Sequence, residues 1–151
     1  MANGSSPDDA LAVSMPAALA EIPVLAERIE AFCDSHDIGP GVAHAINLSL
    51  DELLTNIVSY GFDDPAGHTI DVRLEKAADA VTVVLSDDAR PFDPFSAPDP
   101  DTDAALEDRP IGGLGVFLVR ELMDGVEYRR VDGRNVVTLN KRIGTETDAT
   151  E

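Results

Sequence analysis

The chain has 151 residues, a length that suits one domain with one hydrophobic core. Hydrophobic residues make up 44% of it and aromatic residues only 5%, so the composition predicts a globular domain with an aliphatic core. The formal net charge of -18 disfavours a direct nucleic-acid partner, because the phosphates would be repelled.

Three further features narrow the class of protein. The single cysteine, Cys33, excludes an internal disulfide and a zinc site built on cysteine pairs, and we expect a buried thiol in a reducing cytoplasm. The first residues, MANGSSPDDA, lack the basic and apolar regions of a signal peptide. No uncharged apolar run approaches the roughly 18 residues that a transmembrane helix needs. The sequence therefore predicts a cytoplasmic protein that does not enter a membrane.

The N-terminal part of the chain predicts one strand followed by two helices. LAVSM, at 11–15, is a short strand candidate, and 22–36 carries apolar residues at helical spacing until HDIGP ends the helix. The second helix, over 41–60, gathers six apolar residues on one stripe: Val42, Ile46, Leu50, Leu53, Ile57 and Tyr60. Glu52 and Asn56 lie together on the flank of that stripe, at the edge of the predicted core.

The middle of the chain predicts two strands and a long connection. TIDVRLE, at 69–75, alternates strictly, with Ile70, Val72 and Leu74 inward. AVTVVLSDD, at 80–88, predicts a more fully buried strand that ends in acids. The next segment, 89–110, is rich in proline and aspartate. A connection of about 20 residues is unusual inside a compact domain and is often a functional lid, although a disordered insertion has the same composition.

The last predicted elements are a helix and a hairpin. IGGLGVFLVRELMD, at 111–124, is a glycine-rich turn that opens into a mostly apolar helix. GVEYRRVDGRNVVTLNKR, at 125–142, predicts a hairpin with Asp132-Gly133 at its turn.

The order of elements predicts the fold class. A strand, two helices, two strands, a lid, a helix and two strands indicate an α+β fold. We expect a two-layer sandwich with a mostly antiparallel, mixed sheet and with helices on one face. The domain is predicted to span 10–143, between disordered tails at 1–9 and 144–151.

The GGLG turn, Gly112 to Gly115, is suited to binding a phosphate. Glycines let backbone amides approach an anion closely, and the helix that follows points its positive N-terminal end at the same place. The stretch is not a Walker loop, because no Gly-Lys-Ser/Thr follows, and the Rossmann spacing is absent. Alone it is weak evidence, because glycine-rich turns before helices are common.

Two pairs of polar residues are the other candidates. Asp87 ends a buried strand together with Asp88, and a carboxylate there would accept a hydrogen bond from a base amino group. An ordinary polar strand end is the alternative. Glu52 suits a general base, and Asn56 offers a neutral oxygen that suits Mg²⁺. Polar residues on a helix surface are the alternative for this pair.

The order of these motifs is more specific than any one of them. An acid and an asparagine on a helix come first, then a strand-end aspartate, a lid, and a glycine turn before a helix. This order resembles the Bergerat-fold (GHKL) ATPases, which have a histidine-kinase-like ATPase domain with an N box and two glycine boxes. Within that superfamily the chain looks most like the anti-sigma factor serine/threonine kinases. The matching stretches, over roughly residues 10 to 142, are DELLTNIVSYGF, SDDARPFDP, IGGLGVFLVRELMDGVEY and GRNVVTLNKR.

The resemblance implies a site for ATP and Mg²⁺. Glu52 would be the catalytic base that orients or deprotonates a substrate hydroxyl, and Asn56 would bind the Mg²⁺ that bridges the phosphates. Asp87 would bind the adenine amino group, with weaker help from Thr138 on the last strand.

The resemblance also implies a loop around the phosphates. Gly113 and Gly115 would give backbone amides to the phosphates, and Gly112 and Leu114 would shape the loop. Residues 94–111 would form the ATP lid.

The chain departs from the family pattern at Ala89. The first glycine box usually has glycine two residues after the adenine-binding aspartate. A methyl group there disfavours positive φ and adds bulk where the backbone approaches the nucleotide. We therefore expect a lowered nucleotide affinity or a reshaped pocket.

Two functions remain open on the sequence. The first is an Mg-ATP-dependent kinase and anti-sigma factor that phosphorylates a STAS-type anti-anti-sigma partner and thereby controls its hold on a sigma factor. The second is a non-catalytic module that binds a sigma factor or another regulator, with or without ATP; Ala89 and the acidic lid favour it. The resemblance further implies a homodimer, whose surface the sequence does not mark.

Overall fold

The computed structural model describes residues 9–96 and 113–143, with side chains from residue 116 onward in the second range. Gly112, most of the predicted lid and nearly all of both predicted tails lie outside the described residues. The elements in chain order are β1 (Ala10–Pro16), α1 (Glu21–Ser35), α2 (Pro40–Asn56), the π-helical turn η2 (Ile57–Gly61), β2 (Thr69–Lys76), β3 (Ala80–Asp87), α3 (Gly113–Leu122), β4 (Gly125–Val131) and β5 (Arg134–Arg142).

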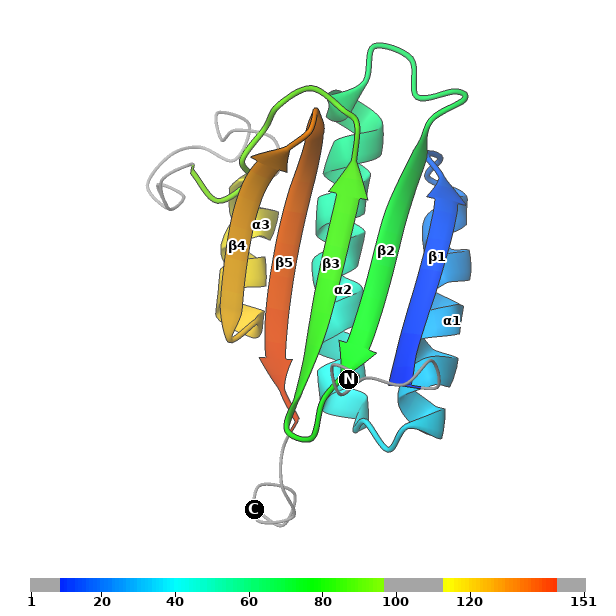
Figure 1. Cartoon of the computed structure of the whole chain (residues 1–151), viewed down its shortest axis with the longest axis vertical. Coiled ribbons are helices and arrows are strands. Elements are labelled where there is room, and N and C mark those ends of the chain that lie inside the picture. The colour runs from blue at the N-terminus through cyan, green and yellow to red at the C-terminus, as the bar shows by residue number, and fades with distance from the viewer. Residues whose placement is uncertain (1–8, 97–112, 144–151) are drawn as a thin grey trace.

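Five strands form one sheet in the order β1-β2-β3-β5-β4, and the helices pack on one of its faces (Figure 1). The predicted α+β sandwich is therefore confirmed. Each of the four strand pairs is antiparallel, so the described sheet is antiparallel throughout rather than mixed. None of the helices in the described part of the chain is long and apolar enough to cross a membrane.

The inward face of the sheet carries the core. On β2 the predicted inward residues Ile70, Val72 and Leu74 are all buried. β3 alternates in the same way: its odd-numbered residues 81 to 87 are buried and the residues between them are half-buried. The outward residues Thr69, Asp71 and Arg73 of β2 are exposed, whereas those of β3 are half-buried, so the expectation of a more fully buried strand is confirmed. A row of paired residues across the sheet places Asp87 between Ile70 and Asn135.

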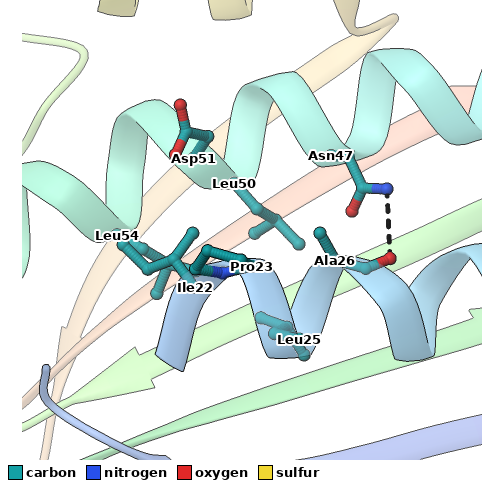
Figure 2. A pocket seen from close by; sticks show the side chains of 8 residues that line it. All are labelled: Ile22, Pro23, Leu25, Ala26, Asn47, Leu50, Asp51 and Leu54. Carbon is teal, nitrogen blue, oxygen red and sulfur yellow. Dashed lines mark hydrogen bonds between the residues drawn. The ribbon is translucent and has the colours of Figure 1, made fainter. Parts of the chain in front are cut away.

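α1 and α2 pack side by side over the sheet. Pro40 begins α2, where its missing N–H costs nothing. Figure 2 shows the shallow groove between the two helices, lined by Ile22, Pro23, Leu25, Ala26, Asn47, Leu50, Asp51 and Leu54. Asn47 Nδ2 donates across this groove to the carbonyl oxygen of Ala26, at 3.4 Å.

The second helix changes character before its predicted end. It is α-helical to Asn56 and then forms the π-helical turn η2. Such a turn takes in extra residues and shifts the register of everything after it. Tyr60 is 50% exposed, so the prediction that it joins the buried stripe is wrong. Gly61, the last residue of η2, lies near the end of β3, and the carbonyl oxygen of Gly61 accepts a hydrogen bond from Arg90 N at 3.1 Å.

The predicted hairpin is present. Asp132 has φ 52° and Gly133 has φ 80°, the pair of positive values that a tight two-residue turn between β4 and β5 requires. Because this turn fixes the register of β5, it also decides which β5 residues face the helices.

Candidate active site

The predicted motifs meet at one end of the sandwich. In Figure 1 the C-terminal ends of β3 and of α2 with η2 point to the same end of the molecule, and α3 begins there. α2 contacts α3 directly. The helix with Glu52 and Asn56, the strand-end Asp87 and the start of the glycine-turn helix are therefore brought to one region.

Glu52 and Asn56 lie on the side of α2 that faces away from α1. Asn56 comes nine residues after Asn47, which is about 180° around an α-helix, so it points away from the groove of Figure 2. Both side chains are half-buried. Within the described residues, neither makes a hydrogen bond or an ion pair. A carboxylate and an amide that are sheltered but unpartnered are available to a ligand.

Asp87 differs from Glu52 and Asn56, because it is buried and accepts hydrogen bonds from other residues of the chain. The residue is 2% exposed. Oδ1 accepts hydrogen bonds from Ala89 N at 2.9 Å and from Asn135 Nδ2 at 3.0 Å. Both bonds that the described residues make to this carboxylate end on Oδ1, so Oδ2 remains to accept a bond from a ligand.

Asn135 is a candidate site residue that the sequence alone did not identify. It is only 5% exposed and lies opposite Asp87 in the sheet. Its Nδ2 donates to three oxygens, at 2.9 to 3.4 Å: Asp87 Oδ1, Ala89 O and Arg90 O. Its Oδ1 accepts from three donors, at 2.6 to 3.2 Å: Phe92 N, Tyr128 Oη and Arg130 Nη1. These partners fix the orientation of the amide and tie the loop after β3 to the β4–β5 hairpin.

Thr138 does not lie beside Asp87. It pairs with Val84 across the β3–β5 ladder and is half-buried, in alternation with the buried Val137 and Leu139. Thr138 therefore faces away from the helices, whereas Asp87 faces towards them. Asn135 occupies the place predicted for Thr138. Counting back in steps of two from the inward β5 residues identifies Asn135 as the polar residue on that face.

Ala89 does not have the positive φ that a glycine at its position would allow. Among the described non-glycine residues, positive φ occurs only at Asp37 and Asp132. Ala89 is 4% exposed, and its carbonyl oxygen accepts a hydrogen bond from Arg130 Nη1 at 2.9 Å. The residue is thus unstrained and bonded into the loop after β3.

Three of the four residues of the predicted glycine turn are helical and begin α3. Gly113, Leu114 and Gly115 form the first residues of this helix, whereas Gly112 lies outside the described residues. At the other end of α3, Lys141 Nζ donates to Leu122 O at 2.7 Å. A cation at the helix C-terminus complements the helix dipole, whose positive end lies at Gly113. The helix is therefore oriented to favour an anion beside the region that holds Asn56.

The described residues suit a cation held mainly by a substrate. They contain no group of three or more histidine, cysteine, aspartate or glutamate side chains that could hold a metal ion. Mg²⁺ does not need such a group, because it usually takes one or two protein oxygens and keeps phosphates and waters as its other ligands. The unpartnered oxygen of Asn56, one turn from the carboxylate of Glu52, fits that chemistry.

Comparison with known proteins agrees with this geometry. The family model described as the histidine kinase-like ATPase domain matches residues 15–141. The chain therefore belongs to the histidine kinase-like ATPase domain family.

Its relatives include named protein kinases. The serine/threonine-protein kinase BtrW of Bordetella bronchiseptica is 32% identical over 102 residues, which cover 68% of this chain and 72% of that protein. The serine-protein kinase RsbW of Halalkalibacterium halodurans is 28% identical over 92 residues, which cover 58% of this chain and 56% of that protein.

The fold is also shared with solved structures, as one example shows. This structure contains the RsbU and RsbW domains of Rv1364c from Mycobacterium tuberculosis and matches with a TM-score of 0.63 at 15% identity. The match covers 89% of this chain but only 32% of that chain.

Proposed function

We propose that this chain is an Mg-ATP-dependent serine/threonine-protein kinase and anti-sigma factor that phosphorylates a STAS-type anti-anti-sigma protein. The family and the names of the two kinase relatives support this proposal. The observation that carries it is the pair of half-buried, unpartnered side chains Glu52 and Asn56, at the same end of the fold as the buried Asp87.

ATP binding is divided between two parts of the site. Asp87 Oδ2 accepts a hydrogen bond from the 6-amino group of adenine, while Asn135 and Ala89 N hold Oδ1 in place. Gly113 and Gly115 offer backbone amides to the phosphates at the start of α3, where Leu114 lies between them. Bound Mg²⁺ would neutralise charge on the phosphates, and Asn56 would supply its protein ligand.

Phosphoryl transfer then depends on Glu52. The hydroxyl oxygen of the substrate serine or threonine attacks the γ-phosphorus, and the bond from that phosphorus to the β,γ-bridging oxygen breaks. Glu52 orients the hydroxyl and accepts its proton, and ADP leaves. The chain mainly contributes positioning and electrostatic stabilisation, which this type of reaction requires.

The biological consequence is a choice between two partners in the cytoplasm. Unphosphorylated STAS-type protein binds the kinase and frees the sigma factor, whereas the phosphorylated form dissociates and lets the kinase hold the sigma factor again. We further propose that the working form is a homodimer, as the resemblance to anti-sigma kinases implies. The large negative charge of the chain is consistent with protein partners rather than direct contact with DNA.

A phosphorylation assay tests the proposal. The chain is incubated with radiolabelled Mg-ATP and a candidate STAS-domain protein, beside a Glu52→Ala variant. We expect label on the STAS protein with the native chain, and none with the variant, which should still bind the STAS protein. Unlabelled STAS protein at saturating Mg-ATP, despite proven binding, would favour the non-catalytic regulator-binding module instead.

A further inference from the structure

Gly61 and Ala89 face each other across the junction between η2 and the loop after β3. A Cβ atom built on Gly61 lies 2.9 Å from the Cβ of Ala89, and the next nearest atom is Ile57 Cγ2 at 3.6 Å. Two real Cβ atoms essentially never approach within 3.0 Å. The junction therefore has room for one methyl group, and in this chain residue 89 carries it.

Ala89 has little freedom to move away from Gly61. Its N–H donates to Asp87 Oδ1 at 2.9 Å and its carbonyl oxygen accepts from Arg130 Nη1 at 2.9 Å, so the peptide groups on both sides of its Cα are held. The N–H of the next residue, Arg90, donates to Gly61 O at 3.1 Å. The backbone at 89 and 90 is thus bonded to the sheet on one side and to the end of η2 on the other.

The same junction connects the two halves of the proposed site. Asp87 lies two residues before Ala89, and η2 follows Asn56 directly. Two exposed side-chain pairs involve the residues on either side of Ala89: Arg90 Nη2 lies 2.7 Å from Asp63 Oδ1, and His68 Nδ1 lies 3.1 Å from Asp88 Oδ1. Exposed pairs of this kind contribute little, so the close packing of Gly61 on Ala89 and the bond from Arg90 N decide the spacing.

We propose that Gly61 and Ala89 are a size-complementary pair that sets the distance between the adenine-binding loop and the helix end that follows Asn56. The methyl group of Ala89 packs on Gly61 and does not intrude on the nucleotide. Replacement of the usual glycine at 89 is therefore compensated by glycine at 61, and it does not weaken ATP binding. This inference rests on the proposed ATP site, and it reverses the expectation that Ala89 lowers nucleotide affinity.

A double-mutant cycle tests the pair. The proteins are the native chain, Gly61→Ala, Ala89→Gly and the double variant, and Gly41→Ala serves as the control because nothing lies within 4 Å of a Cβ at Gly41. Two quantities are measured for each: the Kd for Mg-ATP and the thermal unfolding midpoint without ligand. We expect Gly61→Ala to lower the midpoint and to weaken ATP binding about tenfold or more. Ala89→Gly in that background should return both towards native values, and alone it should not tighten ATP binding.

The opposite results would overturn the inference. Tighter ATP binding in Ala89→Gly, with a harmless Gly61→Ala substitution, would mean that the methyl group faces the nucleotide. Independent, additive effects in the cycle would mean that the two residues do not interact. If Gly61→Ala does not fold, recovery of folding in the double variant is the deciding result. If no protein binds ATP, the proposed function fails, while the four ligand-free midpoints still decide whether the pair is coupled.

Discussion

Two polar regions lie at the same end of this fold, and they are built in opposite ways. Around Asp87 the buried carboxylate and the amide of Asn135 are joined by hydrogen bonds to each other and to the loop backbone. Glu52 and Asn56, on α2, are half-buried and make no hydrogen bond within the part of the chain that the structure describes. Folding pairs most polar groups of the first region, whereas the side chains of the second have no partner among the described residues.

Because of this difference, substitutions near Asp87 should mainly affect stability, and substitutions at Glu52 or Asn56 should mainly affect activity. Buried polar groups cost free energy unless they are paired, so changes near Asp87 should be felt by the ligand-free protein. Half-exposed groups without partners contribute little to folding, so changes at Glu52 or Asn56 should be felt only when nucleotide and substrate are bound.

The largest effect is expected from Glu52→Gln. This change keeps the size of the side chain but removes the base, and positioned bases typically contribute about 10²- to 10⁴-fold to rate. We expect the phosphorylation rate of the STAS-type partner to fall by that range. The free energy of unfolding should change by no more than about 0.5 kcal/mol, as at other surface-like sites. A comparable loss of stability would show that Glu52 has a structural partner.

Asn135→Asp should have the largest effect on the ligand-free protein. Asn135 Nδ2 donates a hydrogen bond to Asp87 Oδ1, and the change puts a second carboxylate at about the position of this amide. Loss of the hydrogen bond and repulsion between buried charges should lower the free energy of unfolding by about 3 kcal/mol, measured by urea denaturation at pH 7.

The matched control for this change is Asn140→Asp. Asn140 is exposed on the same strand, and its Oδ1 accepts from Thr82 Oγ1 at 2.9 Å, a bond that a carboxylate preserves. Its effect should stay within about 0.5 kcal/mol. Equal effects at the two asparagines would contradict the view that the hydrogen bonds around Asp87 stabilise the folded protein.

Ser49→Ala should stabilise the protein slightly. Ser49 lies on α2, is fully buried, and its Oγ has no hydrogen-bond partner among the described residues. Removing an unsatisfied buried hydroxyl should raise the free energy of unfolding by about 1 kcal/mol. Ser59→Ala, at an exposed position of η2, is the control and should be neutral. A destabilised Ser49→Ala variant would indicate a buried water or another partner for the hydroxyl.

The effect that is smallest at neutral pH concerns Cys33, on the α1 side of the core and away from both polar regions. Burial raises the pKa of its thiol from 9.0 to about 11, and the neighbouring Glu30 carboxylate adds to the shift. The folded state favours the neutral thiol, so this contribution to stability is fully present below pH 9 and is lost as the pH rises towards 11.

Urea denaturation between pH 8 and pH 11 measures that contribution. The native chain should lose more stability over this range than Cys33→Ala, in which all other titrating groups are unchanged. The native thiol should also react slowly with a thiol reagent at pH 8 and rapidly after unfolding. Equal pH dependence in the two proteins would contradict the raised pKa.

The fold could be predicted well from the sequence, and so could the positions of Glu52 and Asn56 on α2, for physical reasons. Alternation identified β2, helical spacing identified α1 and α2, and the Asp132-Gly133 turn identified the last hairpin, because each of these signals is local. Glu52 and Asn56 could be placed on one flank because helix geometry is regular up to Asn56. Tyr60 was misplaced because the π-helical turn that follows leaves no clear periodic signal.

The other half of the site depends on contacts between distant segments. Asn135 was missed because its importance arises from pairing with Asp87, 48 residues earlier in the chain. Thr138 was chosen instead, although strand alternation puts it on the opposite face. The contact of Ala89 with Gly61, on which its proposed packing role rests, is created only by η2 and has no local signal in the sequence. Sequence patterns report local geometry, and these residues depend on tertiary packing.

The most direct test of the account is thermal unfolding of the native chain and of Asn56→Ala, each with and without Mg-ATP. A ligand that binds only the native state adds about 2.7 kcal/mol of stability at a concentration 100-fold above its Kd. We expect Mg-ATP to raise the thermal unfolding midpoint of the native chain clearly. Asn56→Ala should lack that rise while keeping the native midpoint without ligand. An unchanged midpoint of the native chain at millimolar Mg-ATP would contradict the proposed nucleotide site.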